Sequence, residues 1–286
     1  MQVNSRKKME NDLKVRLLKH NVKLKKAYGQ NFLTDASLLN EIVEKAGVTS
    51  LDTVLEIGPG AGALTYFLAS KAKKVVCYEI DTSLKPVLDD VLEDFNNTEI
   101  VFKDVMKESL EVIESKLGDE YIMVANLPYY ITTPIVMRFL ENSKKIKAMV
   151  IMVQEEVATR FSAPPKNTDY GAITVAINLR GKAQKILRVG REKFTPVPNV
   201  DSAIVKIDID HTKNAGVDLD NVREVVKVAF SSRRKMLVNN LMNFYKLPRS
   251  VAESVLTSAG VSLTARAEEL SSDEFINLTN ALREIK

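Results

Sequence analysis

The stretch Thr53-Val-Leu-Glu-Ile-Gly-Pro-Gly-Ala-Gly62 places a short apolar strand directly before a turn that holds three glycines. The next strand pattern, Lys74–Glu79 (KVVCYE), ends on an acid 21 residues after Gly58. Glycines let a turn bend tightly and let a ligand approach its backbone, and an acid at this distance can accept hydrogen bonds from both hydroxyls of a ribose. The G-x-G-x-G spacing differs from the dinucleotide fingerprint, and no Walker Lys-Ser/Thr pair follows, so P-loop chemistry is excluded. The two features together predict a nucleoside site, whereas either alone also fits an ordinary turn or strand end.

Strand and helix patterns alternate on both sides of this turn. The predicted strands are short, apolar and rich in Val and Ile, as strands buried on both faces are. They cover residues 53–57, 74–79, 99–102, 121–125 and 148–153. Helical patterns accompany them at 38–46, 64–71, 83–95, 109–116, 134–140 and 155–161. This alternation predicts an α/β fold with a parallel sheet and helices on both sides of it.

The pattern changes after Pro164-Pro165. Strand-like stretches then follow without a helix between them and predict antiparallel strands at one edge of the sheet: 172–179, 185–189 and 202–209. A polar linker at 211–220 precedes stretches that are all helical, at 222–230, 234–245, 249–259 and 272–283. In the last of these, Ser271 stands three residues before Glu274, as in a capping box. We therefore predict a basic arm over 1–27, an α/β catalytic domain over 28–212 and a small all-helical domain over 213–286.

Composition narrows the class of protein. Of the 286 residues, 45% are hydrophobic and 27% are charged, which is the balance of a globular chain with ample material for a core. The longest apolar run, residues 148–153, is far shorter than the ~20 residues that span a bilayer, and no secretory signal pattern is seen. A single cysteine, Cys77, excludes a disulfide framework, and with two histidines a structural zinc site is not expected. We expect a cytoplasmic protein with no metal and no membrane contact, in which Cys77 has a packing role.

The positive charge is concentrated in two short segments. Residues 1–26 carry nine Lys and Arg against two acids, and residues 223–249 carry seven against one, whereas the body between them is mildly acidic. Such patches are the electrostatic footprint of a protein that binds a polyanion, most simply a nucleic acid. A solvated helix and a charged tail would give the same counts, so charge alone leaves both interpretations open.

A second motif, Asn126-Leu-Pro-Tyr129, directly follows the fourth predicted strand, where open α/β sheets bind ligands. The Asn126 side-chain oxygen and the Leu127 carbonyl before Pro128 can both accept hydrogen bonds from one exocyclic amine, and Tyr129 can stack on a base. Two acceptors on the hydrogens of an adenine N6 would raise electron density at a nitrogen whose lone pair is otherwise delocalised. Alone, the motif is more simply a turn; beside a nucleoside site, it predicts chemistry on an adenine.

From Tyr28 to Ile285 the sequence resembles the ribosomal RNA adenine N6-methyltransferase family, and within it most closely the small-subunit (16S) rRNA adenine dimethyltransferases. The resemblance rests on motifs in the family's order: 29–33 (GQNFL), 56–62 (EIGPGAG), Glu79, Asp104, 126–129 (NLPY) with ITTPI after it, 194–202 (FTPVPNVDS) and 230–241 (FSSRRKMLVNNL). After Gln154 this chain has Glu155, where the family usually has a lysine, which casts doubt on a phosphate contact from that helix.

The resemblance implies a Rossmann-like S-adenosylmethionine-dependent methyltransferase sheet with an antiparallel edge. It also implies S-adenosylmethionine as methyl donor, S-adenosylhomocysteine as product, and 16S rRNA within the small ribosomal subunit as partner. We expect the protein to be a monomer. Donor binding is carried over to Asn31, Leu33, Gly58, Gly60, Glu79, Asp104 and Asn126. The catalytic role on a flipped adenine goes to Asn126, Leu127, Pro128, Tyr129 and Phe194. RNA contacts are expected from Lys25, Lys26, Arg233, Arg234 and Lys235.

Three other functions remain as alternatives. The large-subunit (23S) rRNA adenine methylase shares the catalytic half, so the choice between the two depends on the helical tail, which resembles that of the small-subunit enzyme. A ribosome assembly factor would keep the fold without the activity, but intact Glu79, Asp104 and Asn126 argue against this. A DNA adenine methylase is disfavoured because the tail shows no DNA-reading motif.

Overall fold

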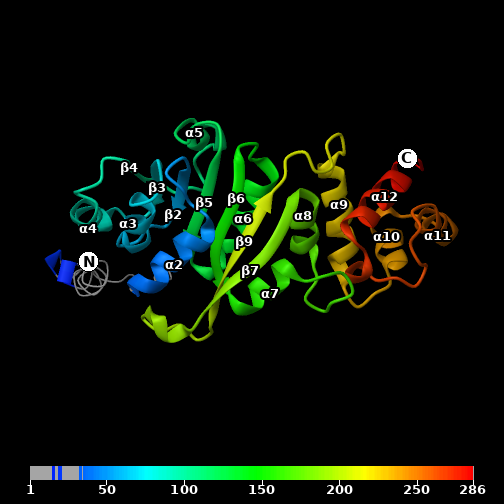
Figure 1. The fold of residues 1–286 in the computed structure, drawn as a ribbon. Coiled ribbons are helices and arrows are strands. Elements are labelled where there is room, and N and C mark those ends of the chain that lie inside the picture. Colours follow the sequence, from blue (N-terminus) through cyan, green and yellow to red (C-terminus); the bar gives the residue numbers. More distant parts are fainter. Residues whose placement is uncertain (1–14, 17–18, 21–31, 34, 286) are drawn as a thin grey trace. The chain divides into compact units, whose positions relative to one another are not determined.

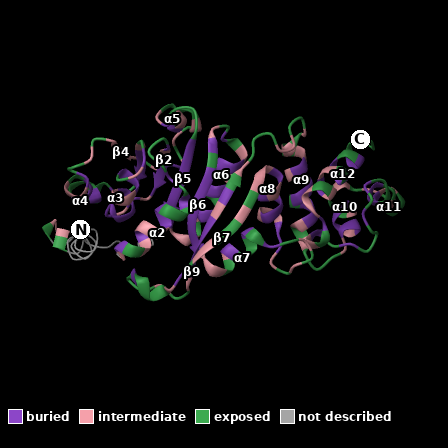
Figure 2. Ribbon diagram, viewed as in Figure 1, coloured by how far each residue is buried: buried purple, intermediate pink, exposed green. Residues whose placement is uncertain are grey.

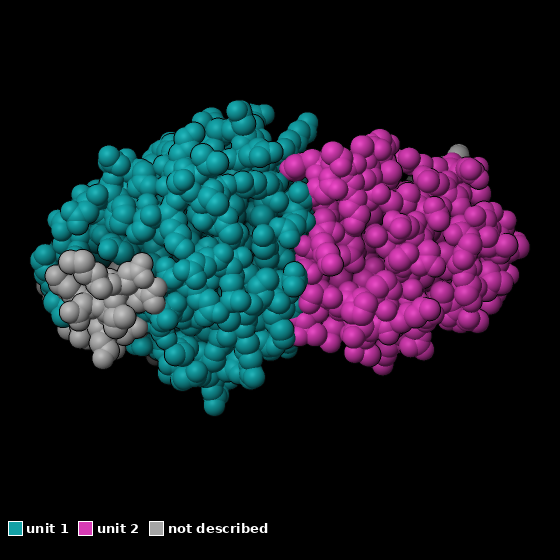
Figure 3. All heavy atoms as spheres, viewed as in Figure 1, with its two compact units in different colours: residues 1–158, 184–209 teal, residues 159–183, 210–286 magenta. Residues whose placement is uncertain are grey.

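The computed structural model describes residues 15–16, 19–20, 32–33 and 35–285 (Figure 1). The chain divides into two compact units, shown in different colours in Figure 3. The first, here called the sheet unit, comprises Met1–Ala158 and Gln184–Ile209. The second, the helical unit, comprises Thr159–Ala183 and Asp210–Lys286.

A seven-stranded, mostly parallel sheet with strand order β4-β3-β2-β5-β6-β9-β7 forms the centre of the sheet unit. The strands are β2 (Thr53–Ile57), β3 (Lys74–Glu79), β4 (Thr98–Phe102), β5 (Tyr121–Asn126), β6 (Ile146–Gln154), β7 (Gly181–Val189) and β9 (Ser202–Ile209). The first five pair in parallel and β9 runs antiparallel to β6, so the predicted parallel sheet with an antiparallel edge is confirmed. Strand order reverses at β2, which lies between β3 and β5, and this is the point at which open α/β sheets bind ligands.

Helices α2 (Ala36–Ala46), α3 (Ala63–Ala69), α4 (Lys85–Val91), α5 (Leu110–Ser115), α6 (Tyr129–Asn142) and α7 (Glu155–Ser162) accompany these strands. The central strands are buried along most of their length because helices and neighbouring strands cover them (Figure 2). Asp35 begins α2 by accepting the backbone N–H groups of Ser37 and Leu38, and Gly47 ends it in the left-handed conformation. Both are ordinary cap residues for an amphipathic helix.

A separate two-stranded sheet pairs β1 (Phe32–Leu33) with β8 (Phe194–Thr195) in antiparallel register, with Leu33 opposite Phe194. The partners are about 160 residues apart in the chain, and nothing in either local sequence predicts their pairing. The pairing matters for function because it places two predicted site residues next to each other.

The helical unit contains α8 (Ala172–Arg180), α9 (Leu219–Ala229), α10 (Leu237–Tyr245), α11 (Arg249–Ser258) and α12 (Ser272–Arg283) around an apolar core. The capping box of α12 forms as predicted: the Ser271 hydroxyl accepts the Glu274 N–H, and the Glu274 carboxylate accepts the Ser271 N–H.

One sequence prediction is wrong: residues 172–179 form helix α8 and not an edge strand. The stretch AITVAINL is rich in β-branched residues, but Val175 and Leu179 are buried against α9 and α12, and tertiary packing overrides the strand propensity. As a consequence, 159–183 belongs to the compact helical unit, although the sequence had placed it inside the catalytic domain.

Candidate active site

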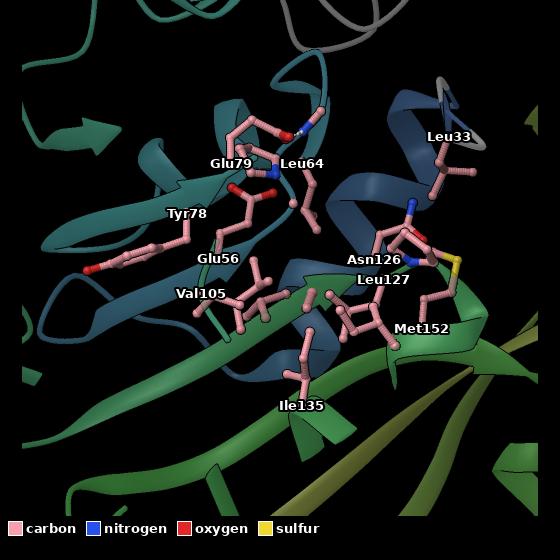
Figure 4. A pocket seen from close by; sticks show the side chains of 18 of the residues that line it. Leu33, Glu56, Leu64, Tyr78, Glu79, Val105, Asn126, Leu127, Ile135 and Met152 are labelled. Carbon is pink, nitrogen blue, oxygen red and sulfur yellow. Dashed lines mark hydrogen bonds between the residues drawn. The ribbon is translucent and has the colours of Figure 1, made fainter. Parts of the chain in front are cut away.

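A cavity of about 370 Å³ lies at the carboxyl ends of the central parallel strands (Figure 4). It is entirely within the sheet unit. The predicted donor and target residues that the structure describes all line it: Leu33, Gly58, Gly60, Glu79, Asp104, Asn126, Leu127, Pro128, Tyr129 and Phe194. Asn31 lies outside the described residues. One cavity therefore joins the glycine turn to the Asn-Leu-Pro-Tyr motif.

The glycine turn after β2 needs glycine for its backbone shape. Gly58 and Gly60 have φ angles of 71° and 58°, in the left-handed region that favours glycine. A Cβ atom on Gly60 would lie 3.1 Å from Cε1 of Phe32, and one on Gly58 would face the backbone oxygen of Asn126 at 4.0 Å. The Gly58 N–H donates to the Tyr78 carbonyl at 2.9 Å, which fixes the turn to β3. The turn thus presents bare backbone to the cavity.

Glu79, at the end of β3, is held by backbone donors. Its Oε2 accepts the Gly60 N–H at 3.1 Å and its Oε1 accepts the Asp81 N–H at 2.8 Å. Burial raises the pKa of this carboxyl, and the backbone N–H groups of Asp81, Gly60 and Ile80 partly offset that effect. Each carboxylate oxygen can accept a further hydrogen bond, so Oε1 and Oε2 can still accept hydrogen bonds from the two hydroxyls of a ribose.

Asp104 follows β4 and lies on the same cavity as Glu79. Its Oδ1 accepts the Met106 N–H at 2.9 Å, which orders the loop as an Asx turn. Ile80, an apolar side chain that is 50% exposed, also lines the cavity. A carboxylate and an apolar surface together suit the amine edge and the face of a purine.

The Asn-Leu-Pro-Tyr motif joins β5 to α6: Asn126 is the last residue of β5 and Tyr129 the first of α6. The Tyr129 hydroxyl is 2.9 Å from the Ser202 hydroxyl at the start of β9, which positions the ring. Within the described part of the chain, no hydrogen bond is found for the Asn126 side chain. Figure 4 shows Asn126 and Glu79 on different sides of the cavity. Phe194 is 2% exposed and completes the apolar wall near Leu33.

Glu56 lines the cavity and is the first residue of the motif 56–62, but the sequence assigned no role to its side chain. It is buried near the carboxyl end of β2, and its Oε2 accepts from the Cys77 thiol at 3.4 Å. Burial raises the pKa of Glu56 to about 7, and the nearby Glu79 carboxylate adds to the shift. The signal was present in the sequence as a lone acid inside the apolar strand TVLEI. Cys77 is fully buried, as predicted, and burial raises the pKa of its thiol.

A model of the ribosomal RNA adenine dimethylase family matches residues 21–284. The chain belongs to this family. The membership confirms the resemblance drawn from the motifs, and the fold is that of the S-adenosylmethionine-dependent methyltransferases.

Curated members of the family extend over nearly the whole chain. The Ribosomal RNA small subunit methyltransferase A of Bacillus pumilus is 41% identical over 274 residues, which are 93% of this chain and 94% of that protein. The protein of the same name from Bacillus licheniformis is also 41% identical, over 94% of each chain. The prediction of the small-subunit branch is thus supported by relatives that match both units.

Two solved structures share the fold at high coverage. A dimethyladenosine transferase from Plasmodium falciparum superposes with a TM-score of 0.74 at 26% identity, over 87% of this chain and 96% of that one. The 23S rRNA methyltransferase ErmE gives a TM-score of 0.68 at 30% identity, over 88% and 100%. The large-subunit enzyme is therefore similar in fold but less similar in sequence than the small-subunit relatives.

The predicted RNA-contacting residues of the family tail do not form one uniform cluster. Arg233 donates through Nη2 to the carbonyls of Thr168 at 2.6 Å and Tyr170 at 2.9 Å, so its guanidinium stabilises the helical unit itself. Arg233, Arg234 and Lys235 are all exposed, but no partner for Arg234 or Lys235 is found in the described part of the chain. Lys25 and Lys26 lie outside the described residues.

Among the described residues, no group of three or more His, Cys, Asp or Glu is arranged to hold a metal ion. None of the helices in the described ranges is long and apolar enough to cross a membrane.

Proposed function

We propose that this protein transfers methyl groups from S-adenosylmethionine to N6 of two adjacent adenines near the 3′ end of 16S rRNA in the small ribosomal subunit. It would act as a cytoplasmic monomer with a role in subunit biogenesis. The observation that carries the proposal is the single cavity that joins the Gly58–Gly60 turn, Glu79 and Asp104 to Asn126, Tyr129 and Phe194.

The donor side of the cavity fits an adenosyl group. Glu79 accepts the ribose hydroxyls, Asp104 accepts from the adenine amine, and the backbone at Gly58 and Gly60 allows close approach. Leu33 and Asn31 would contact the same ligand from the N-terminal motif. S-adenosylmethionine supplies a methyl group on a sulfonium centre and leaves as S-adenosylhomocysteine.

The target side holds an adenine that has left its stack, because a stacked N6 cannot be reached. Tyr129, fixed by Ser202, and the buried Phe194 bracket the base. The Asn126 side-chain oxygen and the Leu127 carbonyl before Pro128 accept the two N6 hydrogens. These oxygens stabilise the positive charge that develops at N6 during transfer. After the first methylation a single N6 hydrogen is left, so a dimethylating site must release one of these bonds.

RNA affinity would come from outside the cavity. Arg234 and Lys235 are exposed cations on the helical unit, and Lys25 and Lys26 belong to the basic arm over 1–27. We propose 28–212 as the catalytic domain and 213–286 as the RNA-binding domain, with 159–183 contributing to the core of the latter. Phosphate contacts of this kind position a substrate without reading its sequence.

The test is mass spectrometry of small-subunit and large-subunit rRNA after incubation with the protein and labelled donor. Each RNA is supplied both as a subunit and as free RNA. We expect N6,N6-dimethyladenosine at two adjacent positions in the small-subunit RNA only. Label confined to the large-subunit RNA would favour the 23S enzyme, and the absence of label in every RNA would favour the non-catalytic assembly factor.

A further inference from the structure

The loop that carries Asp104 is tied to α6 by a single side chain, Arg138. The guanidinium of Arg138 donates through Nη1 to the carbonyl of Val105 and through Nη2 to the carbonyl of Glu108. Arg138 is partly buried and is not among the residues that line the cavity, whereas Asp104 and Val105 both line it. Arg138 therefore does not face a cavity ligand itself, but it contacts the loop that does.

The loop has few other constraints. Asp104 accepts the Met106 N–H, and the Lys107 and Glu108 N–H groups donate to the Asp104 carbonyl at 3.0 and 3.3 Å. These bonds are all local, within five residues of one another. Lys103 pairs with Glu108 at 2.5 Å, but Lys103 is 60% exposed, so solvent weakens that contact. Within the part of the chain that the structure describes, the hydrogen bonds that tie this loop to another element are those of Arg138.

The chemistry of arginine suits this task. Its planar guanidinium presents donors in a fixed fork, so two carbonyls three residues apart can be held at a set separation. A lysine has one ammonium on a flexible stem and does not impose that separation. The anchored helix α6 begins with Tyr129, so the same rigid element carries the target-side ring at its start and Arg138 two and a half turns later.

We infer that Arg138 is the positioning residue for Asp104, and so sets how strongly the site selects the amine of the donor's adenine. The inference rests on the proposed function, because it takes Asp104 as the acceptor for that amine. Arg138 holds the Val105 and Glu108 carbonyls and thereby keeps the Asp104 carboxylate facing the cavity.

The test measures binding of S-adenosylhomocysteine by calorimetry, so no methyl transfer is needed for a readout. The variants are Arg138→Met, Asp104→Ala, the double variant, and Arg138→Lys as the conservative change. Lys144→Met is the matched control, because Lys144 is an exposed cation just beyond the end of α6. A second ligand, the same thioether with hypoxanthine in place of adenine, lacks the exocyclic amine. Thermal unfolding of every variant checks that it is folded.

We expect Arg138→Met to weaken S-adenosylhomocysteine binding about tenfold, a coupling typical of residues in one hydrogen-bond network. Arg138→Lys should recover part of the loss, and Lys144→Met should change nothing. The loss should vanish in the Asp104→Ala background and for the hypoxanthine ligand. An equal loss in those two cases would mean that Arg138 only supports the fold, which would overturn the inference.

Failure of the proposed function would look different. If Asp104→Ala alone leaves the affinity for S-adenosylhomocysteine unchanged, Asp104 does not contact the adenine amine, whatever Arg138 does. If Arg138→Met fails to fold, the loss of S-adenosylhomocysteine affinity is measured instead for Arg138→Lys, in the wild-type and in the Asp104→Ala background. Equal weakening by Arg138→Lys in both backgrounds would then contradict the inference.

Discussion

The two sides of the cavity are built differently. On the donor side, backbone N–H groups hold Glu79 from two directions and a third orders Asp104, so the acceptors are set before any ligand arrives. On the target side, Tyr129 is held by one hydroxyl pair, and the Asn126 side chain has no hydrogen bond within the described residues. Among the described residues, the acceptors of the proposed donor side are thus ordered by the fold, whereas the proposed target side has fewer such contacts.

This difference separates two kinds of free energy. Contacts that exist before binding contribute to donor affinity, while a group that becomes fully bonded only as charge develops contributes mainly to the rate. Substitutions on the two sides should therefore change different measured quantities.

The largest effect is expected at Asn126. Asn126→Ala removes an acceptor for the N6 hydrogens and should lower the methylation rate by roughly 10²-fold or more, as loss of one charge-stabilising group does. Affinity for the ribosomal subunit should stay nearly unchanged, because phosphate contacts made elsewhere dominate it. Asn126→Asp keeps an acceptor and should retain partial activity in single-turnover assays. Near-wild-type turnover in Asn126→Ala together with complete loss in Asn126→Asp would remove Asn126 from this role.

Glu56 tests how strongly the donor side is desolvated. Its pKa is raised to about 7 in the folded chain, so the folded state keeps a proton that the unfolded state releases above its ordinary pKa of 4.5. Its contribution to stability is therefore present at low pH and is lost as pH rises from about 4.5 to 7. Glu56→Gln should then raise the free energy of unfolding by roughly 3 kcal/mol at pH 8.

Urea unfolding of the donor-free protein checks this at pH 5 and pH 8. The difference between Glu56→Gln and wild type should be small at pH 5 and large at pH 8. Glu79 and Cys77, the titratable groups that influence the pKa of Glu56, are present in both wild type and Glu56→Gln. A difference that is the same at both pH values would show that Glu56 does not titrate in this range.

Glu79 should affect donor affinity. A hydrogen bond to a charged acceptor is worth about 1.5–3 kcal/mol, so Glu79→Ala should weaken S-adenosylmethionine binding by roughly ten- to a hundredfold in calorimetry. Asp81 is a poor control, because it is buried and accepts from the Ser83 N–H and hydroxyl. Glu93, an exposed acid after α4, is the better match, and equal losses in Glu79→Ala and Glu93→Ala would contradict the ribose assignment.

The smallest effect concerns RNA affinity, which belongs to neither side of the cavity. Replacing Arg234 and Lys235 together with Ala should weaken subunit binding several-fold and reduce the slope of log K against log salt by about 1.5. Arg233→Ala should instead lower the melting temperature, since its guanidinium holds two carbonyls of the helical unit. Filter binding at several salt concentrations gives the slope for each variant. A larger change in slope for Arg233→Ala than for the Arg234 and Lys235 double variant would show that Arg233 is the main RNA contact.

Local sequence patterns predicted the strands, the glycine turn and the position of the acid on the proposed donor side. The strand, turn and acid at β2 and β3 are contiguous, and their roles follow from parallel-sheet geometry. The pairing of Leu33 with Phe194 could not be predicted from the residues alone, because it joins distant segments through two-residue strands. Helix α8 was mistaken for a strand because packing, not propensity, decides its form. Nothing in the sequence distinguished Arg233 from Arg234, because hydrogen bonds from a side chain to carbonyls about 65 residues away cannot be predicted from local sequence.

The most direct test of the division between the two sides is the single-turnover rate on the small ribosomal subunit as donor concentration is raised. At saturating S-adenosylmethionine, we predict that Glu79→Ala recovers a rate within a few-fold of wild type, because only its donor affinity is impaired. Asn126→Ala should remain roughly 10²-fold slow at every donor concentration. A Glu79→Ala rate that stays low at saturation, or an Asn126→Ala rate that recovers, would contradict the account.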